Sequence, residues 1–206
     1  LVVRHNRRIG VGLLGLVEFA ASMGLRYSDI RHSEKIRTFL TELAETVDDE
    51  AWKYSRQLGI PMPIKRRTIA PTGTVAKLCG HSEGAAPIYA RHWIQRIRYS
   101  NDDPLLQDEI AKGRHTEPCQ YTANTTVVAT PVRASILDDY PPELIESVDE
   151  LDIDDLLGTQ AFFQEVWSDN AVSFTCNVSE DLKAAELEQA LIQWMPKLKG
   201  STIFPD

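Results

Sequence analysis

The 206-residue sequence has little cysteine and no long apolar run, and both absences exclude classes of protein. Its three cysteines, Cys79, Cys119 and Cys176, are widely spaced and form no Cys-x-x-Cys pair, so we expect a reducing, cytoplasmic setting rather than a disulfide scaffold. No stretch approaches the roughly 18 consecutive apolar residues of a membrane span. A secretory signal and an initiator Met are also missing, and the chain ends abruptly at Phe204-Pro205-Asp206, so we expect a piece of a longer protein.

Basic residues are absent from one stretch of the chain, which accounts for the net charge of −8. Between Asp138 and Asp155 there are nine carboxylates and no Lys or Arg, which leaves 22 basic residues against 30 − 9 = 21 acidic ones elsewhere. A chain that is otherwise balanced indicates neither nucleic acid nor a membrane surface as a partner. We predict an acidic surface excursion over about 134–155.

Helical and strand patterns alternate along the rest of the sequence, which predicts an α/β sheet or barrel. Apolar residues recur at three- and four-residue steps from Ile36 to Leu58, as on one face of a long helix, and residues 92–99 alternate as a strand does. Asp103-Pro104 is a good start for a helix. The predicted helices are 7–23, 36–58, 74–78, 104–112, 154–167 and one capped by Ser179, and the predicted strands are 67–70, 92–99, 125–129, 171–178 and 201–204.

The segment from Pro71 to Lys77 follows a short predicted strand and contains a turn with Gly73 and the start of a helix. This order is typical of a phosphate-binding loop. Glycine lets the backbone approach an anion closely, and first-turn amides that lack helical partners point toward it. The predicted phosphate-binding residues are Pro71, Thr72, Gly73, Thr74, Val75 and Ala76. An ordinary turn before a capped helix is the simpler alternative on spacing alone. A P-loop is excluded because its first glycine and its Gly-Lys-Ser/Thr ending are missing.

Other residue patterns indicate chemistry more weakly. Lys77, Glu83, Arg96 and Arg98 are predicted as pocket-lining residues, with surface ion pairs or caps as the alternative. Ser168-Asp169-Asn170 matches one motif of the penicillin-recognising serine enzymes, but the Ser-x-x-Lys nucleophile is absent, so we interpret it as a helix-to-strand turn. A zinc site made by Cys79, His81, His115 and Cys119 is disfavoured by its spacing, and no metal is expected.

Several segments in order resemble one family, and the resemblance runs nearly end to end. The sequence is similar to the class II, adenosylcobalamin-dependent ribonucleotide reductases, in particular the monomeric ribonucleoside-triphosphate reductase. The matching segments are Asn6-Arg7-Arg8-Ile9-Gly10, Pro71-Thr72-Gly73-Thr74-Val75-Ala76-Lys77-Leu78, Ser82-Glu83-Gly84, Ile94-Gln95-Arg96-Ile97-Arg98, Asp103-Pro104-Leu105-Leu106, Tyr121-Thr122-Ala123-Asn124-Thr125-Thr126, Thr159-Gln160-Ala161-Phe162 and Trp167-Ser168-Asp169-Asn170-Ala171-Val172-Ser173.

The resemblance implies a fold and a reaction. The fold is a ten-stranded α/β barrel, of which residues 1–206 supply much of the second half-barrel, the C-terminal part of the catalytic domain. The reaction is the reduction of a ribonucleoside triphosphate by thiyl-radical chemistry, with adenosylcobalamin as cofactor, a thioredoxin-like reductant and a monomeric enzyme. The resemblance also implies that the Pro-Thr-Gly-Thr loop binds the substrate's phosphates.

The family's radical cysteine lies in an Asn-x-Cys-x-Glu signature that is absent from this sequence. The resemblance places that signature upstream of Leu1, so we assign no catalytic residue in this chain and expect the isolated chain to be inactive. Two alternatives stay open: a reductase of another class, with a metal-bearing partner subunit or a glycyl radical, and a non-catalytic nucleotide-binding module.

Overall fold

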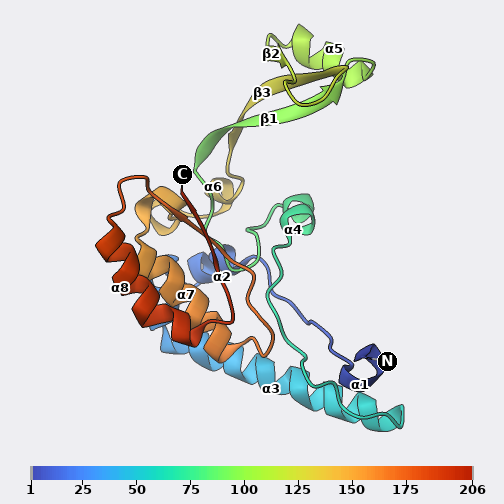
Figure 1. Cartoon of the computed structure of the whole chain (residues 1–206), viewed down its shortest axis with the longest axis vertical. Helices are drawn as coiled ribbons and strands as arrows, with labels where there is room; N and C mark the ends of the chain where they lie inside the picture. Colours follow the sequence, from blue (N-terminus) through green and yellow to red (C-terminus); the bar gives the residue numbers. More distant parts are fainter. Residues whose placement is uncertain (1, 206) are drawn as a thin grey trace. The chain divides into compact units, whose positions relative to one another are not determined.

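The computed structural model describes residues 2–205, without the side chain of Arg4, and its helices and strands alternate as predicted (Figure 1). The α/β class is therefore confirmed. The α-helices and strands are α1 (Val2–Asn6), α2 (Leu16–Ser22), α3 (Glu34–Gln57), α4 (Gly73–Cys79), β1 (His92–Ser100), α5 (Pro104–Ala111), β2 (His115–Pro118), β3 (Thr125–Arg133), α6 (Ile136–Asp139), α7 (Ile153–Val166), β4 (Thr175–Val178), α8 (Ala184–Trp194) and β5 (Thr202–Pro205).

The chain divides into two compact units. The first comprises residues 1–89 and 135–206, and the second is the continuous stretch Ala90–Ala134. The first unit contains the loop predicted to bind phosphate, and the second contains Arg96 and Arg98.

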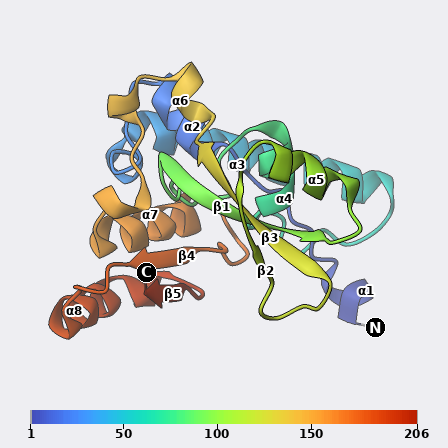
Figure 2. The ribbon, with the colours of Figure 1, turned by 90° about the horizontal axis from the view of Figure 1, so that it is seen from above.

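Four extended segments of the first unit run parallel to one another. Val11 pairs with Arg67, and Ile69 pairs with Val172. Strand β4 pairs with β5, and Figure 2 shows the two strands side by side. Helices lie in the connections between these segments, because parallel neighbours need long crossovers rather than hairpins. The predicted strands 67–70, 171–178 and 201–204 thus become neighbours, and the loop at Pro71 follows the end of one of them.

The predicted helix over 7–23 is wrong in its first half, because α2 begins only at Leu16. The amides of Ile9 and Val11 donate to the carbonyl oxygens of Lys65 and Arg66 at 3.0 and 2.8 Å, so residues 9–11 form an extended segment. At Gly10, a Cβ would lie 2.9 Å from Thr68 Cγ2. The missing side chain at Gly10 therefore allows this extended segment to approach the one that contains Thr68.

Helix α7 is the buried centre of the first unit, and α3 and α8 pack against it. Every residue from Leu156 to Gln164 on α7 is buried, which is the pattern of a helix covered on all sides. On α3 the buried apolar positions are Ile36, Leu40 and Ala44. The predicted apolar face is wrong toward the end of α3: the Tyr54 side chain, and Leu58 just past the helix, are 63% and 52% exposed.

The acidic segment packs with its apolar residues inward. Ile145 is fully buried, while six of the nine carboxylates are exposed. Glu146, Asp154 and Asp155 are the three that are not exposed. Glu146 accepts hydrogen bonds from the amide and the hydroxyl of Ser28, and the two aspartates pair with an arginine that precedes α3.

In the second unit, β1 and β3 form an antiparallel ladder that runs from the pair His92–Arg133 to the pair Ser100–Thr125. Strand β2, which was not predicted, joins the free side of β3. The predicted start of α5 is confirmed: the Asp103 side chain accepts from the amide of Leu105 at 2.9 Å.

The predicted cap of the last helix, Ser179, is four residues early, because the observed N-cap is Lys183. The Ser179 hydroxyl accepts locally from the amide of Asp181, and α8 begins at Ala184.

Candidate functional site

The loop predicted to bind phosphate connects the extended segment ending near Ile69 to helix α4, and its backbone is strained. Thr72 has φ 55° and ψ 15°, in the left-handed region that a β-branched residue rarely adopts. Such a conformation costs about 1–2 kcal/mol. The amide of Gly84 donates to Thr72 Oγ1 at 2.9 Å, and this contact holds the strained residue in place.

The strained turn leaves three backbone amides open. Thr72 is the N-cap of α4, so the amides of Gly73, Thr74 and Val75 have no helical acceptor, and no hydrogen bond joins them to other residues within 2–205. The expectation that the amide of Ala76 is also free is wrong, because it donates to the Thr72 carbonyl oxygen at 2.8 Å. Thr74 and Val75 are exposed, so this group of amides faces solvent.

Two of the predicted pocket-lining residues meet at this turn. Lys77 Nζ lies 3.0 Å from Glu83 Oε1. A Cβ on Gly73 would lie 3.1 Å from Glu83 Oε2, so the Glu83 carboxylate is next to the first turn of α4. An anion at this turn would meet the positive charge of Lys77 and the negative charge of Glu83 together.

The loop that carries Glu83 is anchored by residues that the sequence did not single out. Glu18 on α2 accepts from the amide and the hydroxyl of Ser82, at 2.7 and 2.5 Å. The Tyr27 hydroxyl donates to the carbonyl oxygen of Ala85 at 2.8 Å. These partners are 58 to 64 residues apart in sequence, so no local spacing signals them.

Arg96 and Arg98 belong to the second unit, where both are exposed on β1. Arg96 forms an ion pair with Glu117, and both arginines line a cavity of about 770 Å³ together with Cys119 and Tyr121. Their assignment to the substrate pocket stays a prediction.

A second cavity, of about 540 Å³, lies in the first unit between α7, the end of β4 and α8. Asp152, Asp154, Asp181 and Glu186 are among the residues that line it, and no basic side chain is among them. A cavity with this charge repels phosphate. The open amides at the start of α4 carry no such charge barrier and stay the predicted phosphate site of this unit.

The three cysteines are unpaired and differ in their surroundings. Cys176 on β4 is fully buried, and burial raises the pKa of its thiol to about 12. The pKa of Cys119 is lowered, chiefly by a hydrogen bond from the backbone of Tyr121. Cys79 is exposed at the end of α4.

Two further sequence patterns have structural outcomes. The Ser168-Asp169-Asn170 segment is confirmed as a helix-to-strand connection, between α7 and the extended segment at Val172. The side-chain hydrogen bonds of Asp169 and Asn170 to Arg67 are long-range rather than local. Within residues 2–205, no group of three or more His, Cys, Asp and Glu side chains has an arrangement that could hold a metal. Among the same residues, no helix combines the length and the apolar character that crossing a membrane requires.

Comparison with known proteins gives a consistent result. Residues 65–204 match the family described as ribonucleotide reductase, barrel domain. A protein of Mycobacterium phage D29, assigned as an adenosylcobalamin-dependent ribonucleoside-triphosphate reductase, is 42% identical over all of this chain and 32% of its own length. The enzyme of that name from Lactobacillus acidophilus is 36% identical over 99% of this chain and 29% of its own length.

A solved structure agrees with the sequence relatives. The crystal structure of a B12-dependent (class II) ribonucleotide reductase superposes on the whole chain with a TM-score of 0.83 and 33% identity, and the chain covers 30% of that protein. This chain thus spans about a third of the length of the relatives that it matches. The matched family covers more than half of the chain and the relatives share over 30% identity, so the chain belongs to the ribonucleotide reductase family and forms part of its barrel domain.

Proposed function

We propose that this chain is the part of an adenosylcobalamin-dependent ribonucleoside-triphosphate reductase that holds the phosphates of the substrate. The names of the relatives support the reaction, the cofactor and the triphosphate. The observation that carries the phosphate role is the left-handed Thr72, which presents the open amides of Gly73, Thr74 and Val75 on one turn. A strained residue held by a specific contact is typical of a site built for a ligand.

In this proposal each residue of the loop has a separate task. The three amides donate to phosphate oxygens, and the hydroxyls of Thr72 and Thr74 add two further donors. Gly73 leaves room for the phosphate, and Lys77 supplies a positive charge after it leaves Glu83. Pro71 fixes the φ angle before the turn, and Ala76 supports the loop through its buried side chain.

The cofactor would supply the radical chemistry when bound. None of residues 2–205 is assigned to the cofactor. The thioredoxin-like reductant and the monomeric state also belong to the proposal, and no residue of this chain is assigned to either.

The phosphate role is tested by replacing Gly73→Val in a complete enzyme that carries this segment. The new side chain would crowd the first turn of α4, where its Cβ would already lie 3.1 Å from Glu83 Oε2. Binding of a ribonucleoside triphosphate and of inorganic tripolyphosphate should weaken by about 10- to 100-fold, the equivalent of one or two charge-assisted hydrogen bonds. Gly12→Val is the matched control, because Gly12 is exposed in an extended segment and its Cβ would meet only Thr68 O at 3.8 Å. Unchanged tripolyphosphate binding in Gly73→Val contradicts the proposal.

The charges beside the loop give a second test with opposite signs. Lys77→Met should weaken tripolyphosphate binding, and Glu83→Gln should strengthen it, because the first removes an attraction and the second a repulsion. Equal shifts in the same direction would indicate a change of loop structure instead.

Assaying ribonucleotide reduction with and without adenosylcobalamin separates this proposal from its alternatives. Reduction that proceeds without the cofactor favours a reductase of another class. Nucleotide binding without any reduction favours a non-catalytic module.

A further inference from the structure

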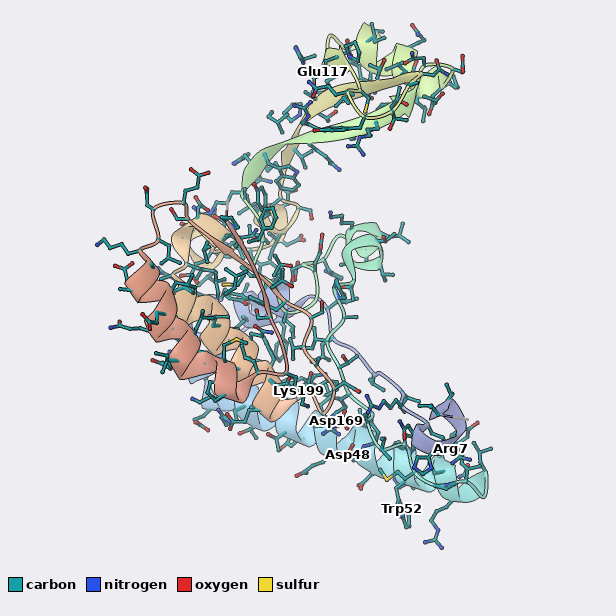
Figure 3. The ribbon with its side chains drawn as sticks, in the orientation of Figure 1. Arg7, Asp48, Trp52, Glu117, Asp169 and Lys199 are labelled. Carbon is teal, nitrogen blue, oxygen red and sulfur yellow. The ribbon has the colours of Figure 1, made fainter. Side chains whose placement is uncertain are left out.

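The turn between α7 and the extended segment at Val172 binds the backbone of the segment that leads to the phosphate loop. Asp169, labelled in Figure 3, belongs to this turn. Its Oδ1 accepts from the amides of Arg66 and Arg67 at 3.0 and 2.8 Å, and its Oδ2 lies 2.9 Å from the Arg66 amide. Asn170 adds the opposite kind of contact, because its amide and its Nδ2 both donate to the Arg67 carbonyl oxygen, at 2.9 and 3.0 Å. This one turn therefore forms hydrogen bonds with both the backbone amide and the backbone carbonyl oxygen of Arg67.

These contacts replace a regular strand ladder. Among the described residues, the segment at Arg67–Ile69 pairs with its neighbours through two isolated bridges, Val11–Arg67 and Ile69–Val172. The amide of Thr68 donates to the Val11 carbonyl oxygen at 3.0 Å, and the amide of Ser173 donates to the Ile69 carbonyl oxygen at 2.9 Å. Single bridges fix the register of a strand weakly, and a slip of one residue would turn every side chain to the opposite face. The half-buried Asp169 carboxylate, whose side chain is 17% exposed, fixes which amides face it and so fixes the register.

A rigid path leads from this contact to the loop. Ile69 is fully buried, and its carbonyl oxygen accepts from the amide of Ser173 at 2.9 Å. The carbonyl oxygen of Ala70 lies close to Gly84, where a Cβ would be only 2.5 Å away. Gly84 in turn donates to the hydroxyl of Thr72. Because each of these contacts fixes the backbone, a shift of Arg67 along the segment would also displace Thr72.

Asp169 is not the only acidic partner of the Arg66 and Arg67 side chains. Asp48 on α3 accepts from Arg66 Nε at 2.5 Å and pairs with the Arg67 guanidinium. Arg67 Nε also donates to the carbonyl oxygen of Trp167 at 2.7 Å. The guanidinium groups thus keep partners without Asp169, whereas the two backbone amides do not.

We infer that Asp169 is a positioning residue for substrate binding: its carboxylate sets the register of residues 66–69 and thereby holds Thr72 and the open amides of Gly73–Val75 where the phosphates bind. This inference rests on the proposed function of the loop. It assigns Asp169 no contact with substrate, and its role is exerted through the backbone.

The test compares Asp169→Asn with Ser33→Ala in the complete enzyme. Asparagine keeps the size of the side chain but turns one acceptor into a donor, which faces a backbone amide. Ser33 caps α3 by accepting from the amide of Ile36, so its loss lowers stability without touching residues 66–75. We expect Asp169→Asn to raise KM for the ribonucleoside triphosphate and Kd for tripolyphosphate about 10-fold, as loss of one charge-assisted hydrogen bond does, with kcat within about two-fold. Ser33→Ala should leave KM and Kd unchanged.

A second readout follows the backbone directly. Hydrogen exchange of the amides in 66–76 should accelerate in Asp169→Asn and stay unchanged in Ser33→Ala. If Gly73→Val weakens tripolyphosphate binding and Asp169→Asn does not, the positioning role is overturned and the phosphate loop stands. If neither variant changes binding, the phosphate loop itself is wrong. Equal losses of kcat and affinity in both Asp169→Asn and Ser33→Ala would show that Asp169 only stabilises the fold, and would overturn the inference.

Discussion

The hydroxyl of Tyr27 donates a hydrogen bond to the carbonyl oxygen of Ala85, and the Tyr27 side chain is fully buried. Burial, with smaller contributions from Cys176 and Asp155, raises the pKa of this phenol well above its ordinary value. The raised pKa keeps the hydroxyl protonated at neutral pH, so it can donate this bond. The bond fixes the loop that carries Gly84, the residue that holds Thr72.

Replacing Tyr27→Phe should lower the free energy of unfolding by about 1–3 kcal/mol, because the ring still fills its site while the Ala85 carbonyl oxygen loses its partner. Chemical denaturation monitored by tryptophan fluorescence measures the change. Tyr89→Phe is a suitable control, since the Tyr89 side chain is 59% exposed. Equal stability of Tyr27→Phe and the wild-type protein would show that water replaces the lost donor.

Replacing Gly158→Ala on α7 should destabilise the protein, although alanine favours a helix over glycine by about 1 kcal/mol. The added Cβ would overlap Arg31 Nη1 and lie 3.0 Å from Trp194 Cζ2. Arg31 has little freedom to move, because it is paired with Asp154 and Asp155 at 3.1 and 3.0 Å. We expect a net loss of about 1–3 kcal/mol from overpacking.

A double-mutant cycle tests whether Arg31 causes the loss of stability in Gly158→Ala. In an Arg31→Ala background the space beside Gly158 opens, so Gly158→Ala should cost much less there, with a coupling of at least about 1 kcal/mol. Additive effects of the two substitutions would show that Arg31 does not restrict this position.

Acid should destabilise the first unit partly through Asp169. Burial by itself raises the pKa of this carboxyl, but the amides and charges of Arg67 and Arg66 outweigh burial and lower the pKa below its ordinary 3.8. A depressed folded pKa contributes stability that is complete above the unfolded value and is lost as the pH falls through the folded value. The free energy of unfolding should thus fall below about pH 4, and Asp169→Asn should make that fall shallower. An unchanged slope between about pH 5 and pH 2 contradicts this assignment.

The three thiols should react with iodoacetamide in a fixed order at neutral pH. Cys119 should react first because its lowered pKa gives it the most thiolate, Cys79 should follow, and the buried Cys176 should react only after unfolding. Peptide mass spectrometry over time measures the three rates, and Cys119→Ser identifies the fast one. Modification of Cys176 in the folded chain at the rate of Cys79 would contradict the order.

Local signals predicted the elements that are determined locally. Asp103-Pro104 predicted the start of α5 because a cap and a fixed φ angle act within one turn. The alternation over 92–99 predicted β1. The extended segment at Ile9–Val11 was missed because its hydrogen bonds go to residues more than 50 positions away, and a glycine-rich apolar run has no strand alternation of its own.

The candidate site was predictable to a similar extent. The turn at Pro71–Gly73 and its open amides follow from a strand, a glycine and a helix start in sequence. The left-handed Thr72 was not predictable, because the contact that supports it comes from Gly84, beyond helix α4. Asp169 was recognised only as a turn residue, since its partners are 102 and 103 residues earlier in the chain.

The parallel pairing of Ile69 with Val172 has a consequence for how the chain is made and folded. A newly synthesised Ile69 segment finds Val11 on one side early, but its other edge stays unpaired until residues more than 100 positions later leave the ribosome. The antiparallel strands β1 and β3 lie within 45 continuous residues and need no such wait. We therefore expect the Ala90–Ala134 unit to fold first, while the edge at Ile69 remains the part of the nascent chain most open to wrong pairing.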